Sequence, residues 1–215
     1  MKRSLAVTSF ALILVIAGLA QAADDGKWTV LFDGADLSAW DNGAGGPPGA
    51  GWVIEDGVVT RKEHAGYIWT KEKFGDFVLE LEFKTEGNSG LFFRTGNPRD
   101  CVQTGLEMQI HKPIETPNKH SVGSLYDALA PSKNAAVDGW NKVVLTAKGS
   151  RITIEMNGQQ IIDADLDQWT EAGKNPDGTN NKYRTAIKDF PREGHIGLQE
   201  HGDVVSFRNI RVRPL

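Results

Sequence analysis

Residues 77–84 read Phe-Val-Leu-Glu-Leu-Glu-Phe-Lys, in which apolar and polar side chains alternate. In an extended strand, successive side chains point to opposite faces of the sheet. One face of this segment therefore carries only large apolar groups, while the other face is mostly charged. This period of two predicts a strand in a sheet that has one face in the protein core. The apolar face comprises Phe77, Leu79, Leu81 and Phe83.

The same alternation recurs in short runs that are separated by turn residues. Asp56-Gly57 and Asn157-Gly158 are strong signals for hairpin turns. Further strands are predicted over 52–55, 58–60, 90–94, 105–111, 142–147, 152–156, 159–162, 194–199 and 204–212. About ten to twelve strands in one domain indicate an all-β protein, a two-sheet antiparallel sandwich such as a jelly roll, with negligible helix after residue 22.

The N-terminus has the three parts of a secretory signal peptide. Lys2 and Arg3 precede an apolar run, and Ala20-Gln21-Ala22 forms an A-x-A cleavage site. The apolar run of about 15 residues is shorter than the ~20 that a spanning helix needs, and no later run is longer. We expect cleavage after Ala22, a single domain over 23–215, a periplasmic or secreted location, and no membrane span in the mature chain.

The charge distribution bears on the kind of partner, and the cysteine content bears on disulfide bonds. The formal net charge is −4 at pH 7, and the basic residues are scattered rather than gathered in a stripe. This distribution argues against a nucleic-acid partner. Cys101 is the single cysteine of the sequence, so no internal disulfide bond is predicted.

Strand parity selects candidate site residues, because alternate side chains share a face. Polar groups fall opposite the apolar face in the three strands at 90–94, 105–111 and 194–201. If these strands lie in one sheet, the groups converge on one surface; an ordinary solvated face is the alternative. Such residue types suit hydrogen bonding to a small carbohydrate. The set comprises Arg94, Glu107, Gln109, His111, Gln199 and His201.

A divalent metal ion is the one cofactor that these residue types suggest. Glu107 and His111 lie about 13 Å apart along one strand and cannot share an ion unless the strand bends sharply between them. His111 is instead a candidate ligand together with His120 or His201.

Two long irregular segments, 112–138 and 163–193, interrupt the strand pattern. Loops of this length in a compact domain are usually functional or disordered. Embedded aromatic residues predict that parts of both segments pack against the domain. They are Tyr126, Trp169, Tyr183 and Phe190.

An ordered string of short segments runs from about residue 28 to the C-terminus. It includes 31–34 (Leu-Phe-Asp-Gly), 88–94 (Asn-Ser-Gly-Leu-Phe-Phe-Arg), 105–110 (Gly-Leu-Glu-Met-Gln-Ile), 123–126 (Gly-Ser-Leu-Tyr) and 194–199 (Gly-His-Ile-Gly-Leu-Gln). This string resembles the 3-keto-disaccharide hydrolase family, also described as 3-keto-glucoside 1,2-lyase and 3-keto-2-hydroxyglucal hydratase. The resemblance implies a concanavalin A-like sandwich of the lectin and glucanase type, with a sugar site on its concave face.

The resemblance implies cleavage of 3-keto-glycosides by elimination across C1–C2, followed by hydration. Glu107 is then the base, and Arg94, or a metal held partly by His111, stabilises the enolate. Tyr126 assists the leaving group. The substrate-binding residues are Gln109, Gln199, His111 and His201.

Two other functions fit a sandwich of this type. A retaining glucanase needs two carboxylates ~5–5.5 Å apart, whereas the candidate face offers Glu107 alone. A carbohydrate-binding module needs aromatic platforms and no base. Trp69, Tyr126 and Trp169 are candidate platforms, so this alternative stays open.

Overall fold

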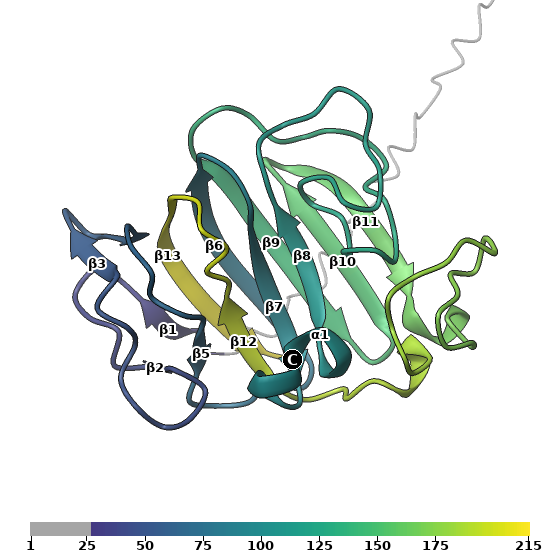
Figure 1. Ribbon diagram of the computed structural model, residues 1–215, viewed down its shortest axis with the longest axis horizontal. Helices are drawn as coiled ribbons and strands as arrows, with labels where there is room; N and C mark the ends of the chain where they lie inside the picture. Colours follow the sequence, from purple (N-terminus) through teal and green to yellow (C-terminus); the bar gives the residue numbers. More distant parts are fainter. Residues whose placement is uncertain (1–26) are drawn as a thin grey trace, which may run out of the picture.

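The computed structural model describes residues 27–215 (Figure 1). The predicted signal peptide, residues 1–22, lies outside the described residues. Within them the chain forms two antiparallel sheets, and the strands of the smaller sheet lie across the middle of the larger one in Figure 1. The predicted all-β, two-sheet antiparallel sandwich is therefore confirmed.

The larger sheet has the strand order β11-β10-β9-β6-β13-β4-β3, and β1 also pairs with β13. The bounds of its strands are β1 Thr29–Phe32, β3 Trp52–Glu55, β4 Val58–Arg61, β6 Phe77–Thr85, β9 Asn141–Lys148, β10 Arg151–Met156, β11 Gln159–Asp165 and β13 Val205–Pro214.

The smaller sheet has the strand order β2-β5-β12-β7-β8. Its strands are β2 Trp40–Asp41, β5 Ile68–Thr70, β7 Ser89–Thr95, β8 Leu106–Ile110 and β12 His195–Leu198. Helix in the described part of the chain is confined to the single turn α1, Cys101–Thr104, and to three 3-10 turns at Pro98–Asp100, Leu166–Gln168 and Ile187–Asp189. None of the helices described here is long and apolar enough to cross a membrane.

The core fills the space between the two sheets. The alternating segment at 77–84 forms most of β6, and the four side chains of its apolar face are all buried. β6 pairs with β13 on one side and with β9 on the other, so it lies in the middle of the larger sheet. From the smaller sheet, Leu91, Met108 and Leu198 bury their side chains in the same cluster.

The two long segments pack against the domain, as predicted. Backbone bonds join Tyr126 N to Glu107 O and Gln109 N to Ser124 O, so residues 124–126 run along the outer edge of β8. The Tyr183 hydroxyl donates to the Tyr126 carbonyl at 2.7 Å. Trp169 and Phe190 are buried. β7 and β8 are buried on both faces. The long segments lie next to β8, and Phe92 of β7 packs against Tyr67 and Trp69.

Candidate active site

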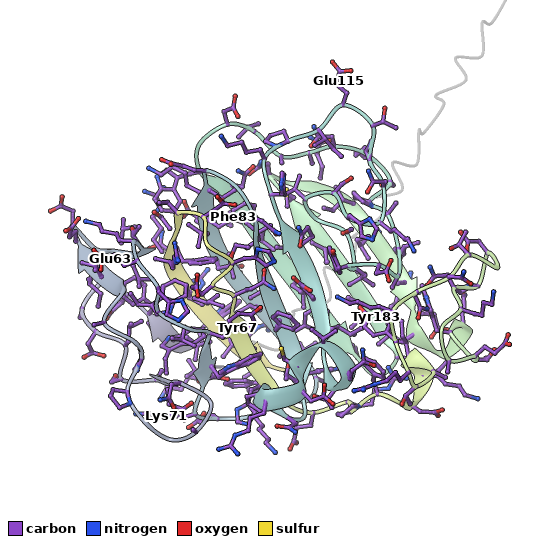
Figure 2. The ribbon with its side chains drawn as sticks, viewed as in Figure 1. Glu63, Tyr67, Lys71, Phe83, Glu115 and Tyr183 are labelled. Carbon is purple, nitrogen blue, oxygen red and sulfur yellow. The ribbon has the colours of Figure 1, made fainter. Side chains whose placement is uncertain are left out.

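A cavity of about 180 Å³ opens on the outer face of the smaller sheet. β8 supplies its centre, and its walls come from the residues just before β7, the residues just after β12, Tyr67 before β5, α1 and the two long segments. Figure 2 labels Tyr67 over the sheet and Tyr183, which belongs to the segment 163–193. The described residues that line the cavity are Tyr67, Asn88, Val102, Glu107, Gln109, Tyr126, Lys182, Gln199 and His201.

Glu107 lies in the middle of β8 with its side chain toward this cavity and only 4% of its surface exposed. Gln199 Nε2 donates to its Oε1 at 3.2 Å, and Lys182 Nζ lies 3.7 Å from its Oε2. Burial raises the pKa of Glu107, although Lys182, His201 and Gln199 pull the pKa the other way. Glu107 is the only carboxylate among the described residues that line the cavity.

Gly90 on β7 makes room for this carboxylate. A Cβ atom at position 90 would stand 2.3 Å from Glu107 Oε1, which is closer than real contacts allow. The glycine at position 90 of β7 is therefore required by the neighbouring side chain, because its own φ is not positive. The space above β7 is thus filled by the Glu107 side chain of β8.

Lys182 enters the cavity from the segment 163–193. Its ammonium nitrogen lies 4.0 Å from the ring centroid of Tyr126. Burial lowers the pKa of Lys182, while Glu107 and Asp127 act in the opposite direction. Burial thus shifts the pKa of Lys182 down and the pKa of Glu107 up.

Asp127 holds the Lys182 backbone in place. The Lys182 amide donates to Asp127 Oδ2 at 2.7 Å, and the same carboxylate pairs with Lys119 Nζ at 2.6 Å. His120 Nε2 lies 3.0 Å from Asp127 Oδ1. One carboxylate therefore joins the two long segments next to the cavity.

Tyr126 forms part of the rim, as predicted. Its ring lies against His120, with 5.0 Å between the ring centroids, and under the Lys182 ammonium on the cavity side. Burial, followed by the nearby charge of Glu107, raises the pKa of Tyr126. The phenol therefore stays protonated at neutral pH and is available as a proton donor.

Amide side chains and a histidine form the polar floor of the cavity. Gln109 Nε2 donates to Asn88 Oδ1 at 2.9 Å, and Asn88 Nδ2 lies 3.3 Å from His201 Nδ1. Within residues 27–215, Gln199 Oε1 is buried and has no hydrogen-bond partner. Neutral donors and acceptors of this kind suit the hydroxyl groups of a sugar.

Tyr67 lines the cavity on another side and packs on two buried aromatic rings. Trp69 and Phe92 have ring centroids 5.7 Å apart, and Tyr67 lies about 6 Å from both. Trp69 fits over the backbone of β12, where a Cβ at Gly197 would stand 2.3 Å from the indole. Burial raises the pKa of Tyr67 to about 12.

The buried tryptophans are not exposed sugar platforms. Trp69 is 2% exposed and lies beneath Tyr67. Trp169 is 3% exposed, and its indole N–H donates to Asn175 Oδ1. The prediction that these two rings serve as platforms is therefore wrong; the tyrosine rings that line the cavity are those of Tyr67 and Tyr126.

Arg94 does not belong to this site, which corrects its predicted placement beside Glu107. Its guanidinium donates to the Gly75 and Gly149 carbonyls and pairs with Asp76 at 2.8 Å. The pairing of β7 with β12 is irregular between Phe92 and Thr95, and Arg94 has a φ of 50°. This irregularity breaks the alternation of faces. The Arg94 side chain therefore joins β7 to the turn after β9.

His111 does not line the cavity either. It follows Ile110, the last residue of β8. Its ring Nδ1 lies 3.3 Å from the Lys112 carbonyl oxygen. Within residues 27–215, no three His, Cys, Asp or Glu side chains come together in a way that suits a metal ion. The expectation that His111 lines the site is thus not met.

The cavity contains residues that the sequence did not single out, namely Tyr67, Asn88, Val102 and Lys182. Asn88 belongs to a segment that carried the family resemblance. Lys182 adjoins Tyr183, an aromatic residue expected to pack. Neither the family segment that contains Asn88 nor the aromatic neighbour of Lys182 predicts that these residues lie next to Glu107.

A family model described as the 3-keto-alpha-glucoside-1,2-lyase-like domain matches residues 27–213. The chain is 27% identical to a protein named 3-keto-disaccharide hydrolase from Bacteroides thetaiotaomicron, and the alignment covers 89% of this chain and 80% of that protein.

Solved structures share the fold. A candidate glycosyl hydrolase from Parabacteroides distasonis is 29% identical, with a TM-score of 0.77 over 88% of this chain and 100% of that chain. A β-glucanase from Bacillus licheniformis is 13% identical, with a TM-score of 0.51 over 88% of this chain and 98% of that chain. The latter likeness concerns the sandwich architecture alone, and it confirms the glucanase-type fold.

Proposed function

The chain belongs to the 3-keto-alpha-glucoside-1,2-lyase-like family, and from this premise we propose that it cleaves 3-keto-glycosides by elimination followed by hydration. The net reaction is hydrolysis of the glycosidic bond. The observation that carries the proposal is the buried Glu107 carboxylate, which has a raised pKa and lies 3.7 Å from a lysine in a sugar-sized cavity.

Glu107 acts as the general base. A ketone at C3 acidifies the hydrogen at C2, so one carboxylate suffices to remove it as a proton. A raised pKa strengthens the base, and general base catalysis typically contributes ~10²–10⁴-fold. The electron pair of the C2–H bond then moves toward the C3 oxygen as an enolate.

Lys182 and Tyr126 complete the elimination. The positive charge of Lys182 lies next to the base and close to the developing enolate. The enolate expels the glycosidic oxygen from C1, and the Tyr126 hydroxyl supplies a proton to that oxygen. The products of this step are an alcohol and a 2-hydroxyglycal that keeps its C3 ketone.

Hydration completes the reaction. Water adds its oxygen to C1 and gives one proton to the Tyr126 phenolate, while Glu107 returns a proton to C2, which releases the free 3-keto sugar and restores both side chains. Gln109, Gln199 and His201 hold hydroxyl groups of the ring throughout. Since no bond forms between a carboxylate and C1, a second carboxylate is not needed.

The glucanase and binding-module alternatives have less support. A retaining glucanase needs two carboxylates ~5–5.5 Å apart, and Glu107 is the one carboxylate among the described lining residues. A binding module has no use for a buried base, and two of its three expected platforms, Trp69 and Trp169, are buried.

The test compares a 3-keto-disaccharide with its unoxidised parent in D₂O. We expect cleavage of the keto sugar alone, with deuterium at C2 of the product. Glu107→Gln should lower turnover by at least about 100-fold, the usual cost of losing a general base. Glu115→Gln, which removes an exposed carboxylate at a loop tip, is the matched control (Figure 2). Retention of the C2 hydrogen, or equal cleavage of the parent sugar, would contradict the mechanism.

A further inference from the structure

Lys182 is placed to do more than supply charge. Its Nζ lies 3.7 Å from Glu107 Oε2, which is longer than the ~2.7–2.9 Å of a strong charge-assisted hydrogen bond. The amine is therefore not locked to the carboxylate. It is the only lysine or arginine among the described residues that line the cavity, and its other close neighbour is the face of Tyr126.

Partial burial increases the share of neutral amine relative to an exposed lysine. Only 29% of the Lys182 side chain is exposed, and burial lowers its pKa. Desolvated lysines with a depressed pKa are the ones that form Schiff bases with carbonyl substrates. The charged groups that face the Lys182 amine are Glu107 from β8 and Asp127 from the segment 112–138.

We propose that Lys182 condenses with the C3 ketone of the substrate and forms a covalent iminium intermediate. This inference rests on the proposed function, because it needs a keto sugar in the cavity. It deepens that function by replacing the enolate with an enamine. A protonated iminium acidifies the neighbouring C–H bond more strongly than a ketone does, so the demand on the Glu107 base falls.

The first half of the sequence forms the enamine. The neutral Lys182 amine adds to C3, and the carbonyl oxygen takes up one proton from solvent and leaves as water, which gives the protonated iminium; the later hydrolysis of the iminium returns that proton to solvent. Glu107 then accepts the C2 proton, and the electron pair of the C2–H bond moves toward nitrogen. The enamine expels the glycosidic oxygen from C1, and this oxygen takes the proton from Glu107 and departs as an alcohol.

The second half releases the sugar. Water adds across the C1–C2 double bond, with hydroxyl at C1 and hydrogen at C2. A second water hydrolyses the iminium and restores both the C3 ketone and the Lys182 amine. One water is consumed overall, and the sequence needs neither an oxidant nor a reductant.

The position of Lys182 is fixed well enough for this chemistry. Its backbone N–H is held by Asp127, and the next residue, Tyr183, is buried with its hydroxyl bonded to the Tyr126 carbonyl. Tyr183 also packs against Phe190, with 5.3 Å between the ring centroids. The amine thus extends from an anchored backbone into the space above Glu107.

Reductive trapping tests the proposal. The purified protein is incubated with a 3-keto-disaccharide and sodium cyanoborohydride, which reduces an iminium faster than a ketone, and its peptides are mapped by mass spectrometry. We expect a reduced sugar adduct on Lys182, and more of it in Glu107→Gln, where the iminium forms but the C2 proton stays. Oxygen at C3 should also exchange with ¹⁸O-labelled water faster than it does without enzyme.

Lys182→Arg separates covalent from electrostatic action, because arginine keeps the charge but cannot form the iminium. We expect no adduct at position 182 and a loss of turnover of at least about 100-fold. The matched control is Lys188→Arg, an exposed lysine of the same segment, which should trap and turn over as the unchanged protein does. Circular dichroism and thermal unfolding check that both variants fold.

Each remaining outcome counts against a defined claim. If the unchanged protein cleaves the keto sugar without an adduct, or Lys182→Arg keeps most of the turnover, the iminium is wrong while the proposed function stands. Adducts spread evenly over exposed lysines would likewise overturn the iminium. If the unchanged protein leaves the keto sugar intact, the proposed function is wrong and this inference falls with it.

Discussion

Glu107 combines the features that make a single carboxylate useful as a base. Burial disfavours its charged form and raises its pKa, while Lys182 and Gln199 keep the carboxylate oriented. Gly90 has no side chain, and a side chain at this position would occupy the space of Glu107 Oε1. Strand parity alone would make Glu107 an exposed residue, but the long segments bury it.

The raised pKa of Glu107 predicts how stability varies with pH. A carboxylate whose pKa is higher in the folded than in the unfolded state favours folding when it is protonated. This contribution to stability is fully present at pH values below the unfolded pKa, which is usually 4.5. That contribution is lost as pH rises through the folded pKa. The free energy of unfolding of Glu107→Gln, minus that of the unchanged protein, should therefore grow as pH rises from below 4.5 toward neutrality. Urea denaturation at a series of pH values measures it.

Glu115→Gln controls for the loss of one negative charge in that series. Its side chain is exposed at the tip of the segment 112–138 (Figure 2). A difference for Glu107→Gln that stays flat or shrinks with rising pH would contradict the assigned direction of the Glu107 pKa.

At the scale of the element, strand alternation predicted much of the site. Glu107, Gln109, Gln199 and His201 were all selected by parity and all line the cavity. Parity holds only while a strand stays regular. It failed at Arg94, where the pairing of β7 with β12 shifts and the backbone adopts a positive φ.

The part of the site that lies on the irregular segments could not be predicted from the sequence. Lys182 lies close to Glu107 because Asp127 holds the Lys182 backbone and because Tyr183 packs against the segment 112–138. These contacts join residues that are far apart in the chain. No local spacing encodes such a contact. Tyr126 was found through the family resemblance rather than through periodicity.

Arg94 should prove structural. Its guanidinium ties β7 to the Gly75 and Gly149 carbonyls, so Arg94→Met leaves acceptors there without partners. We expect the free energy of unfolding to fall by at least about 1–3 kcal/mol, as is usual when a buried hydrogen-bonding group loses its partner. The kcat/KM of the folded protein should be largely unchanged. Urea denaturation and assays below the unfolding transition measure the two effects.

Arg151→Met is the matched control for that variant. Arg151 pairs with Asp163 on the surface of the larger sheet, and 65% of its side chain is exposed. Exposed ion pairs are worth about 0–1 kcal/mol. A large loss of kcat/KM in folded Arg94→Met would contradict the structural role and indicate that Arg94 takes part in catalysis.

At the scale of the whole molecule, the fold was the most predictable property. Period-two alternation in the β6 segment and two Gly-containing hairpin turns are local signals, and the sandwich follows because each sheet must bury one face. The site is a property of the assembled molecule. It needs one sheet for Glu107, two loops for the lysine and tyrosine, and Tyr67, which packs on the buried rings of Trp69 and Phe92.

We propose that the protein is exported and that its leader is cleaved after Ala22. The first paired strand, β1, begins at Thr29 and joins β13, so this cleavage leaves every described strand intact. The lone Cys101 means that the exported domain relies on burial rather than on disulfide bonds for its stability. A chain that starts at Ala23 should therefore fold, and it should match the turnover of the protein recovered from outside the cytoplasm. Mass spectrometry of the exported protein should find Ala23 as its first residue. A product that retains Met1, or that stays attached to the membrane, would contradict the proposal.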